Sequence, residues 1–418
     1  MTQTPHAAAA AASAAPSEDG GRAAATGGAL FFQTGDFAEA WRRRLAGGAE
    51  TYGGQDFSLG VVERLAQARP VTILSWSPRA HDEVIAPNLR SIGISGKDAN
   101  DPAAVARILD AVAPALLIAR SPIPGPLRWA AARGVPVLPI FADIFQPGGS
   151  LKRRWQNRRL ARLLSGPNVP CVCNHSLNAT RSIAAALGLP KTRLVPWDWP
   201  PLDANPDPKP APDTDPARPF TLFFAGAIIA GKGVADCIAA AAAAKAAGRD
   251  LRFSFAGSGE IEAMEAEAAR LGVADRVAFL GPVANTEVRG RMAEHDAVVV
   301  PSRHTYQEGL PKTLLEGLAS RSPVIYSDHP SYASRLRDGE GGLQFTAADP
   351  AALAAACERL RADPGLYARL SAAAPETLAG LYIGIPWNEA IESFIADPAD
   401  SAGWAARRSL AALEAAGA

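Results

Sequence analysis

The chain has 418 residues, of which 48% are hydrophobic and 20% charged, and its 42 Lys and Arg residues balance 42 Asp and Glu residues. This composition fits a globular protein of two or three domains, and zero net charge predicts neither a nucleic-acid partner nor an acidic one. Four cysteines are too few for a disulfide framework and suit a reducing compartment.

Residues 1–27 consist mainly of alanine, glycine and polar residues, so we expect a disordered tail. The segment also lacks the basic start and apolar core of a signal peptide. No uncharged apolar run of about 18 residues follows, so we expect no membrane span and a cytoplasmic protein.

Residues 28–199 alternate short apolar runs with amphipathic segments. We expect strands within 29–35, 71–76, 115–120, 136–142 and 169–174, and helices at 57–68, 102–113, 151–164 and 176–187. Apolar strands that alternate with helices indicate a parallel sheet covered on both faces. This segment is therefore predicted to be a first Rossmann-like domain.

Residues 200–219 hold eight prolines in twenty positions, which predicts a linker. The alternation then resumes in a second doubly wound domain, 220–375. Its strands are expected within 220–226, 251–257, 277–281, 297–302, 323–327 and 342–345, and its first helices at 233–248 and 260–273. Residues 376–418 are expected to be helical and to pack on the first domain. Two such domains enclose a cleft at the carboxyl ends of their strands, where ligands bind.

Two strands of the second domain run directly into glycines. Gly226 and Gly257 end these strands, and Lys232 precedes Gly233 at the expected start of a helix. Glycine allows close approach to a ligand, and a helix N-terminus offers free amides to an anion. Tight strand-to-helix turns also need glycine for structural reasons alone. A lysine between glycines at a strand end has little packing role, which favours a function for Lys232.

Glu308 and Glu316 flank the start of another predicted helix, near Pro311. The amides of residues 309–313 are then expected to face the cleft as an anion site. Glu316 lies about 7.5 Å further along the helix, where it would accept hydrogen bonds from ribose hydroxyls. If the anion is a nucleoside diphosphate that carries a sugar, Glu308 lies on the other side of the phosphates and would reach that sugar. The alternative is that Glu308 only favours the helix dipole and Glu316 is solvated.

These residues carry a resemblance. The stretch 301–328 resembles the donor-binding signature of retaining glycosyltransferases of family 4, which have the two-domain GT-B fold. Pro301-Ser302, Glu308, Glu316 and Pro323-Val324 follow in the order of that signature. The resemblance covers residues 215–375 well and the first domain loosely.

The resemblance implies a set of roles. Glu308 and Lys232 would be catalytic, the first contacting the donor sugar and the second stabilising charge on the leaving nucleoside diphosphate. The donor would be bound by Gly226, Gly257, Gly309, Leu310, Thr313, Leu314, Glu316 and Arg303. No metal ion and no cofactor is expected besides the nucleoside-diphosphate sugar as co-substrate.

The chain departs from the family pattern at two places. Ala227 occupies a position near which the family has an arginine, for which we expect Arg303 to compensate. Ala142 stands where the family has a histidine, and the following Asp143 remains as a candidate to orient the acceptor.

Glycine pairs precede the helix at 57–68. Gly53, Gly54 and Gln55 resemble the family's glycine-rich loop, which faces the acceptor. The alternative is a flexible turn that only leads into the helix.

The helix predicted at 151–164 has six basic residues and no acidic one. Arg154, Arg158 and Arg162 share a face with Leu151 and Trp155, which suits contact with an anionic membrane surface or a lipid-linked phosphate. The alternative is a solvated basic helix that packs through its leucines.

The sequence thus predicts a metal-independent, retaining hexosyltransferase acting on a glycan or lipid-linked acceptor in cell-surface polysaccharide biosynthesis. Two alternatives remain. One is a GT-B nucleotide-sugar epimerase, against which we count the lack of a histidine at an obvious first-domain strand end. The other is a nucleotide-sugar-binding or scaffold protein without transfer activity, which Ala142 and Ala227 favour and Glu308 and Glu316 oppose.

Overall fold

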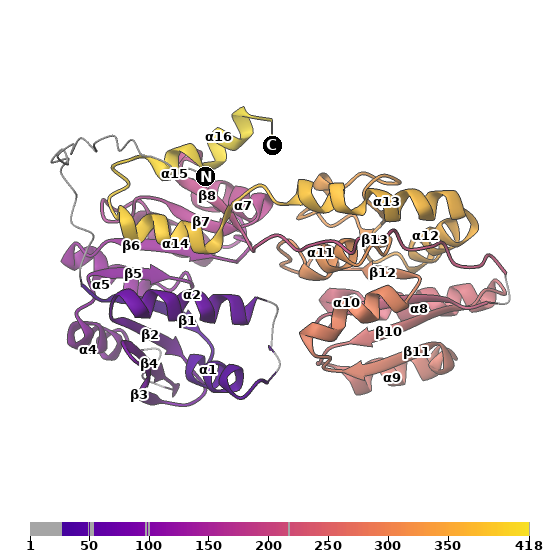
Figure 1. Ribbon diagram of the computed structural model, residues 1–418, viewed down its shortest axis with the longest axis horizontal. Coiled ribbons are helices and arrows are strands. Elements are labelled where there is room, and N and C mark those ends of the chain that lie inside the picture. The colour runs from indigo at the N-terminus through magenta and orange to yellow at the C-terminus, as the bar shows by residue number, and fades with distance from the viewer. Residues whose placement is uncertain are drawn as a thin grey trace, which may run out of the picture.

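The protein, a computed structural model, is described over residues 27–48, 50, 54–96, 98, 101–215 and 218–417. Two α/β domains lie side by side and are joined by two crossings of the chain (Figure 1). The predicted tail, 1–27, falls outside the described residues except for Gly27. Within the described residues, no helix is both long enough and apolar enough to cross a membrane.

The first domain is built on a sheet with the strand order β15-β8-β7-β6-β5-β1-β2-β4-β3. Its strands are β1 (Ala29–Thr34), β2 (Val71–Trp76), β3 (His81–Ala86), β4 (Leu89–Ile94), β5 (Leu116–Ala119), β6 (Val137–Phe141), β7 (Val172–His175), β8 (Leu194–Asp198) and β15 (Ile385–Pro386). Neighbouring strands are parallel except for the antiparallel hairpin of β3 and β4 at one edge.

Helices cover both faces of this sheet. They are α1 (Phe37–Leu45), α2 (Gln55–Ala68), α4 (Pro102–Val112), α5 (Pro124–Arg133), α6 (Leu151–Leu164) and α7 (Leu177–Leu187). Successive residues of a strand point to opposite faces, so β1 contributes Phe31 to one hydrophobic core and Phe32 to the other. This two-sided burial explains why the parallel strands read as continuous apolar runs.

The second domain has an all-parallel sheet with the order β11-β10-β9-β12-β13-β14. Its strands are β9 (Phe220–Ala225), β10 (Leu251–Ala256), β11 (Val277–Gly281), β12 (Ala297–Val300), β13 (Val324–Ser327) and β14 (Leu343–Phe345). Its helices are α8 (Val234–Ala246), α9 (Ile261–Arg270), α10 (Asn285–Glu294), α11 (Lys312–Ala319), α12 (Pro350–Ala362) and α13 (Pro364–Leu381). This strand order is that of doubly wound nucleotide-binding sheets.

The strands and helices expected from the sequence are present, with ends that shift by a few residues. The hairpin β3–β4, strand β8 and helices α1 and α5 were not among the expected elements. Strand β3 begins with His81, Asp82 and Glu83 and alternates partly buried with exposed residues, so it has no apolar run to detect.

The proline-rich crossing has no helix or strand over its described residues, but it is anchored to the second domain. The backbone amide of Asn205 donates to Ala319 O at 2.8 Å, and the amide of Lys209 donates to Ser371 Oγ at 2.7 Å. The Lys209 ammonium donates to Ser322 Oγ at 3.1 Å and to the carbonyl oxygens of Met292 and His295. These hydrogen bonds hold the proline-rich segment against the second domain.

The second crossing follows α13. We placed a boundary at residue 375, and α13 continues across it to Leu381, where its buried leucines still belong to the second domain. The amides of Ile383 and Gly384 then donate to Asp198 Oδ2 at 2.9 and 2.6 Å. Beyond this point β15, α14 (Trp387–Ala396), α15 (Trp404–Arg407) and α16 (Leu410–Ala415) pack on the first domain.

Candidate active site

The strand order of the second sheet reverses between β9 and β12, and ligands of such sheets bind outside the carboxyl ends of the strands at such a point. After β9 the chain passes through the 3-10 turn η2 (Ala230–Lys232) into α8. After β12 it passes through Ser302 and Glu308 to α11. The two predicted catalytic residues, Lys232 and Glu308, thus come from the two loops that flank the reversal.

Lys232 and Glu308 form an ion pair that is largely shielded from solvent. Glu308 is 8% exposed, and its Oε2 accepts hydrogen bonds from both the Lys232 ammonium and Ser302 Oγ, the latter at 2.8 Å. The Lys232 ammonium also lies 4.8 Å from the ring centroid of Tyr306. A positive charge is therefore held at the carboxyl end of β9, where a ligand phosphate could share it.

The chain before α11 presents free backbone amides. Among the described residues, no hydrogen-bond acceptor meets the amides of Gly309, Leu310 and Thr313, whereas the amide of Leu314 donates to Pro311 O at 3.1 Å. Three of the four amides predicted to hold the diphosphate are therefore available, and that of Leu314 is already engaged. Pro311, expected to begin the helix, lies one residue before it.

A second-domain cavity of about 360 Å³ opens beside α11. It is lined by Ala225, Gly226, Ala227, Ala256, Gly257, Ser258, Pro282, Val283, Asn285, Val288, Lys312, Thr313 and Glu316. Glu316 is only 6% exposed, which contradicts the alternative that it is a solvated residue. Burial raises the pKa of its carboxyl group, while Lys312, whose ammonium lies 3.1 Å from Oε1, acts in the opposite direction.

The glycines of this cavity also have a structural reason. Gly226 and Gly257 have positive φ angles of 153° and 147°, and a Cβ atom on Gly257 would lie 1.8 Å from Gly226 O. The loops after β9 and β10 can pack this closely only without a side chain at Gly257. Their packing brings both glycines to the cavity wall, so the structural and the binding interpretations of these glycines are compatible.

Arg303 does not line this cavity. Its guanidinium donates to both carboxylate oxygens of Asp236 in α8, at 2.8 and 2.6 Å. A contact between Arg303 and a donor would have to compete with this bidentate pair. Ala227 lies on the cavity wall, so the structure has no arginine at that position to join Lys232.

The first domain contributes a histidine that the sequence analysis missed. His175 is the last residue of β7, one position beyond the strand predicted there, and it is 9% exposed. A Cβ atom on Gly309 would lie 3.7 Å from His175 Nδ1, so this ring faces the second domain next to Glu308. Desolvation lowers its pKa to about 4, which keeps it neutral near pH 7. Our statement that no histidine ends a first-domain strand was wrong.

The residues predicted on the acceptor side lie in two places. Gly54 precedes α2, and a Cβ atom there would lie 3.1 Å from the Trp199 ring, while Gln55 is the buried first residue of α2. Gly53 lies outside the described residues. Asp143 and Ala142 are exposed in the loop after β6, where Asp143 O accepts a hydrogen bond from Asn174 at 2.8 Å.

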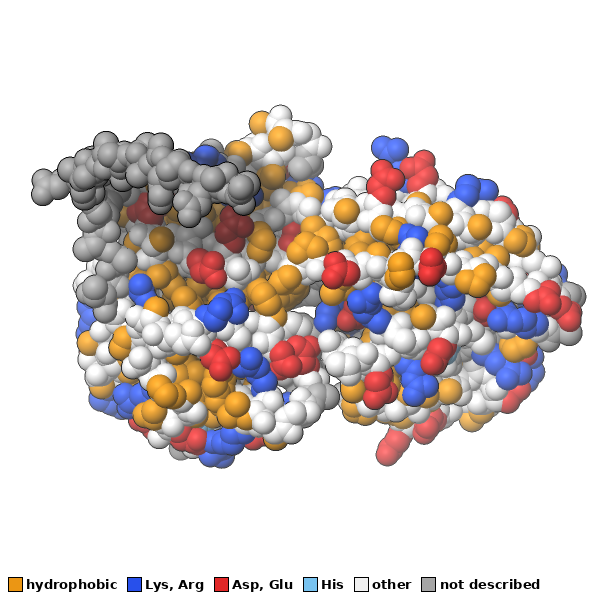
Figure 2. Space-filling model, viewed as in Figure 1, with side chains coloured by type: hydrophobic (Ala, Val, Ile, Leu, Met, Phe, Trp, Pro, Cys, Tyr) orange, Lys and Arg blue, Asp and Glu red, His pale blue; other side chains and the backbone are white. Residues whose placement is uncertain are grey.

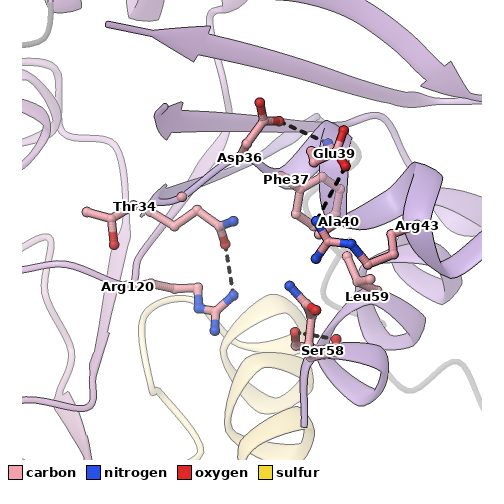
Figure 3. Close-up of a pocket in the computed structure, with 12 residues that line it drawn as sticks. Thr34, Asp36, Phe37, Glu39, Ala40, Arg43, Ser58, Leu59 and Arg120 are labelled. Carbon is pink, nitrogen blue, oxygen red and sulfur yellow. Dashed lines mark hydrogen bonds and ion pairs between the residues drawn. The ribbon is translucent and has the colours of Figure 1, made fainter. Parts of the chain in front are cut away.

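The first sheet has its own cavity, of about 350 Å³, at the point where its strand order reverses between β1 and β5 (Figure 3). Its walls are Gln33, Thr34, Gly35, Asp36, Phe37, Glu39, Ala40, Arg43, Gln55, Ser58, Leu59 and Arg120. Of the predicted site residues, only Gln55 belongs to it. The other members come from β1, α1, α2 and the end of β5.

A hollow between the two domains is visible in the space-filling view (Figure 2), and hydrogen bonds connect the domains beside it. Asn285 of α10 donates to Glu50 Oε2 at 3.0 Å, and Asn178 of α7 donates to Ser331 O at 2.7 Å. Within the described part of the chain, no three His, Cys, Asp or Glu residues are grouped as a metal-ion site.

Comparisons with known proteins find similar sequences in the second domain and similar folds over both domains. Residues 219–363 match the family model described as "Glycosyl transferases group 1". The chain is 31% identical over 179 residues to an alpha-D-kanosaminyltransferase of Streptomyces kanamyceticus, which covers 40% of this chain and 45% of that protein. It is 37% identical over 103 residues to the lipopolysaccharide core biosynthesis mannosyltransferase LpcC of Rhizobium leguminosarum bv. viciae, which covers 25% and 28%. The chain thus spans less than half the length of these curated relatives.

Solved structures resemble the protein over both domains. HepE of Anabaena in complex with UDP and glucose superposes with a TM-score of 0.65 at 14% identity, over 89% of this chain and 99% of that one. WaaG, a glycosyltransferase involved in lipopolysaccharide biosynthesis, superposes with a TM-score of 0.61 at 17% identity, over 88% and 99%. The chain therefore has the two-domain GT-B fold, and its second domain carries the region that matches group 1 glycosyltransferases.

Proposed function

We propose that the protein is a retaining glycosyltransferase that moves a hexose from a nucleoside-diphosphate sugar to a glycan or lipid-linked acceptor in cell-surface polysaccharide biosynthesis. The observation that carries the proposal is the Lys232–Glu308 pair beside free amides at the start of α11, next to a cavity lined by Glu316. The match of this region to group 1 glycosyltransferases supports it.

In the proposed mechanism the nucleoside enters the second-domain cavity and its ribose hydroxyls hydrogen-bond to Glu316. The amides of Gly309, Leu310 and Thr313, with the helix dipole of α11, bind the diphosphate. Negative charge develops on this diphosphate as the bond to the sugar breaks, and Lys232 stabilises it there. Lys232 and the N-terminus of α11 together supply the positive charge with which a metal ion would otherwise stabilise the leaving diphosphate. We therefore propose that the reaction needs no metal ion.

Glu308 has a second role in this mechanism. Its carboxylate orients Lys232 and reaches the transferred sugar, while Ser302 fixes its rotamer by a hydrogen bond. The leaving phosphate takes the proton of the attacking acceptor hydroxyl on the same face of the sugar, which retains the configuration. Neutral His175, opposite Gly309, can hydrogen-bond to a sugar hydroxyl in the cleft.

The test is a thermal-shift panel of nucleoside diphosphates and nucleotide sugars with and without a chelator. A ligand that binds only the folded state raises the unfolding temperature by mass action. We expect one base to raise it with no effect of chelator, and the matching sugar donor to be transferred or slowly hydrolysed. The absence of any shift would leave the scaffold protein without transfer activity as the better description.

One observation favours the alternative function of a nucleotide-sugar epimerase. A neutral histidine, His175, faces the site next to Glu308. The two activities separate without knowledge of the acceptor. An epimerase converts its nucleotide sugar into a stereoisomer in the absence of any acceptor, which chromatography of the sugar detects. A transferase produces only free sugar by hydrolysis.

We further propose peripheral membrane contact through α6. Leu160 and Leu164 anchor the helix, while Leu151 and Trp155 are 84% and 59% exposed. Among the described residues, no carboxylate lies within ion-pair distance of the basic residues of this helix.

Vesicle sedimentation tests this contact. Replacing Arg154, Arg158 and Arg159 by glutamine is expected to weaken binding to anionic vesicles by about 1 kcal/mol per charge removed. Neutral vesicles are the matched control. If the unmodified protein does not sediment with anionic vesicles, the membrane contact is refuted.

A further inference from the structure

Arg120 lines one side of the first-domain cavity. It follows β5 directly, and its Nη1 donates to Gln33 Oε1 at 2.8 Å at the end of β1 (Figure 3). Its guanidinium carbon lies 5.1 Å from the ring centroid of Trp387, at the start of α14. Three segments far apart in the sequence therefore hold this cation in one orientation.

No carboxylate of the described residues forms an ion pair with the Arg120 guanidinium. The two acidic residues of the cavity have other partners: Asp36 accepts from the amide of Glu39 at 2.9 Å and lies 3.9 Å from Arg79, and Glu39 lies 3.3 Å from Arg43. Arg120 is partly buried, and over the described residues no carboxylate lies within 4.0 Å of it. Its partners in the described part of the chain are a neutral amide and a ring, so its positive charge and its other N–H donors can serve an anionic ligand.

We infer that this cavity binds an anionic group of the acceptor, a carboxylate or a phosphate on a sugar, with Arg120 as the residue that determines this specificity. The inference deepens the proposed function and rests on it. A guanidinium suits both groups because its planar fork donates two parallel hydrogen bonds. The cavity also lies at the reversal of strand order, where open α/β sheets bind ligands.

A row of aromatic rings leads from behind Arg120 toward the proposed reaction centre. Trp387, which Arg120 stacks on, lies 6.1 Å from Trp199 between ring centroids, and Trp199 lies 6.4 Å from His175. His175 in turn faces Gly309, the neighbour of Glu308. Trp387 is fully buried and supports Arg120 from behind, whereas Trp199 is partly exposed. An acceptor sugar whose anionic group is bound at Arg120 can therefore extend past Trp199 toward the donor.

The experiment compares three sugars as probes: glucuronate, glucose 6-phosphate and glucose. Their dissociation constants are measured by ligand-observed NMR on the full chain and on the Arg120→Gln variant. Arg133→Gln is the matched control, because Arg133 also lies over a tryptophan, 4.9 Å from the ring centroid of Trp129, but outside the cavity. Nucleoside-diphosphate binding is measured on the same samples.

The unmodified protein and the control are expected to bind one of the two anionic sugars about tenfold more tightly than glucose, with weaker binding at high salt. The preferred probe identifies the group as a carboxylate or a phosphate. Arg120→Gln is expected to lose this preference while nucleotide binding persists. Equal binding of all three sugars, or a preference that survives in Arg120→Gln, would overturn the inference.

A second measurement does not depend on the folding of Arg120→Gln. The side-chain Nε–H resonance of Arg120, assigned by its loss in Arg120→Lys, is expected to shift in the unmodified protein when the preferred anionic sugar is added. An unchanged resonance at saturation would also overturn the inference. Loss of nucleotide binding in every sample would instead refute the proposed function, because that site lies in the other domain.

Discussion

The two sheets each carry a cavity of similar size at the point where strand order reverses, yet the two cavities are built in different ways. In the second domain, most residues that bear the proposed chemistry lie in a short stretch, from Ser302 to Glu316, and Lys232 joins them from the loop after β9. In the first domain, the cavity combines β1, α1, α2 and the end of β5, and the buried ring that supports Arg120 comes from α14 at the far end of the chain.

This difference shows two ways of placing functional groups. A helix N-terminus and the loop before it form most of an anion site from local geometry, so one continuous segment supplies the amides and only Lys232 comes from elsewhere in the chain. A specificity pocket for an acceptor needs side chains from several directions, which only tertiary packing supplies. The predictions below test whether the second domain carries the chemistry and whether the first domain controls it.

The largest expected effect is on the second domain. Glu308→Gln is expected to lower turnover by about 10²- to 10³-fold with little change in donor affinity, because the interaction it removes is strongest in the transition state. Steady-state kinetics with a hydrolysed or transferred donor measures both quantities. Glu340→Gln, a change of an exposed glutamate, is the control. An unchanged turnover would remove the role assigned to Glu308.

The next largest effect is expected from a substitution that disturbs the close packing of the loops after β9 and β10. Gly257→Ala is expected to lower the free energy of unfolding by about 2–3 kcal/mol and to weaken nucleotide binding, because its Cβ would overlap Gly226 O. Gly290→Ala in α10, where a Cβ meets nothing within 4 Å, is expected to be neutral or slightly stabilising. Chemical denaturation gives both values. Equal stability of the two variants would contradict the structural account of Gly257.

The smallest effect concerns the first domain and depends on pH. The pKa of His175 is lowered to about 4 by burial, so between about pH 6.5 and 4 the unfolded chain binds a proton that the folded protein does not. Stability therefore falls as the pH falls through this range. Between pH 7 and 5 the histidine is expected to cost about 1–2 kcal/mol.

His175→Gln removes this contribution, so the variant is expected to lose about 1–2 kcal/mol less than the unmodified protein over the same change in pH. Denaturation at pH 7 and pH 5 measures the difference. His81→Gln, at the edge strand β3, is the control and is expected to behave like the unmodified protein. Identical pH dependence in His175→Gln would mean that the ring is not buried in a neutral state.

Much of the second-domain site was predictable because each of its residues stands in a recognisable local pattern. Glu308, Glu316 and Lys232 were identified from their positions relative to glycines and a helix start, and the structure brings them to one end of the sheet. The engaged amide of Leu314 was not predictable, because a hydrogen bond to Pro311 depends on the local turn geometry. The bond between Arg303 and Asp236 joins residues 67 positions apart, which no local pattern reveals.

His175 was missed for a different reason. A single histidine after a short apolar run is as consistent with a loop as with a strand end, and only the pairing of β7 with β8 shows that the strand includes it. Its position opposite Gly309 then depends on how the two domains face each other.

The sequence by itself determined the two α/β domains, most of their strands and helices, and the donor-side signature, because apolar periodicity and helix-start chemistry are local properties of the chain. Only the tertiary structure decided that the proline-rich segment is anchored, that the C-terminal segment, which was expected to pack on the first domain, also adds strand β15 to its sheet, and that Arg120 lies beside Gln33 and Trp387. These features arise from contacts between residues up to a few hundred positions apart. Such contacts depend on the packing of whole elements, which no short stretch of sequence specifies.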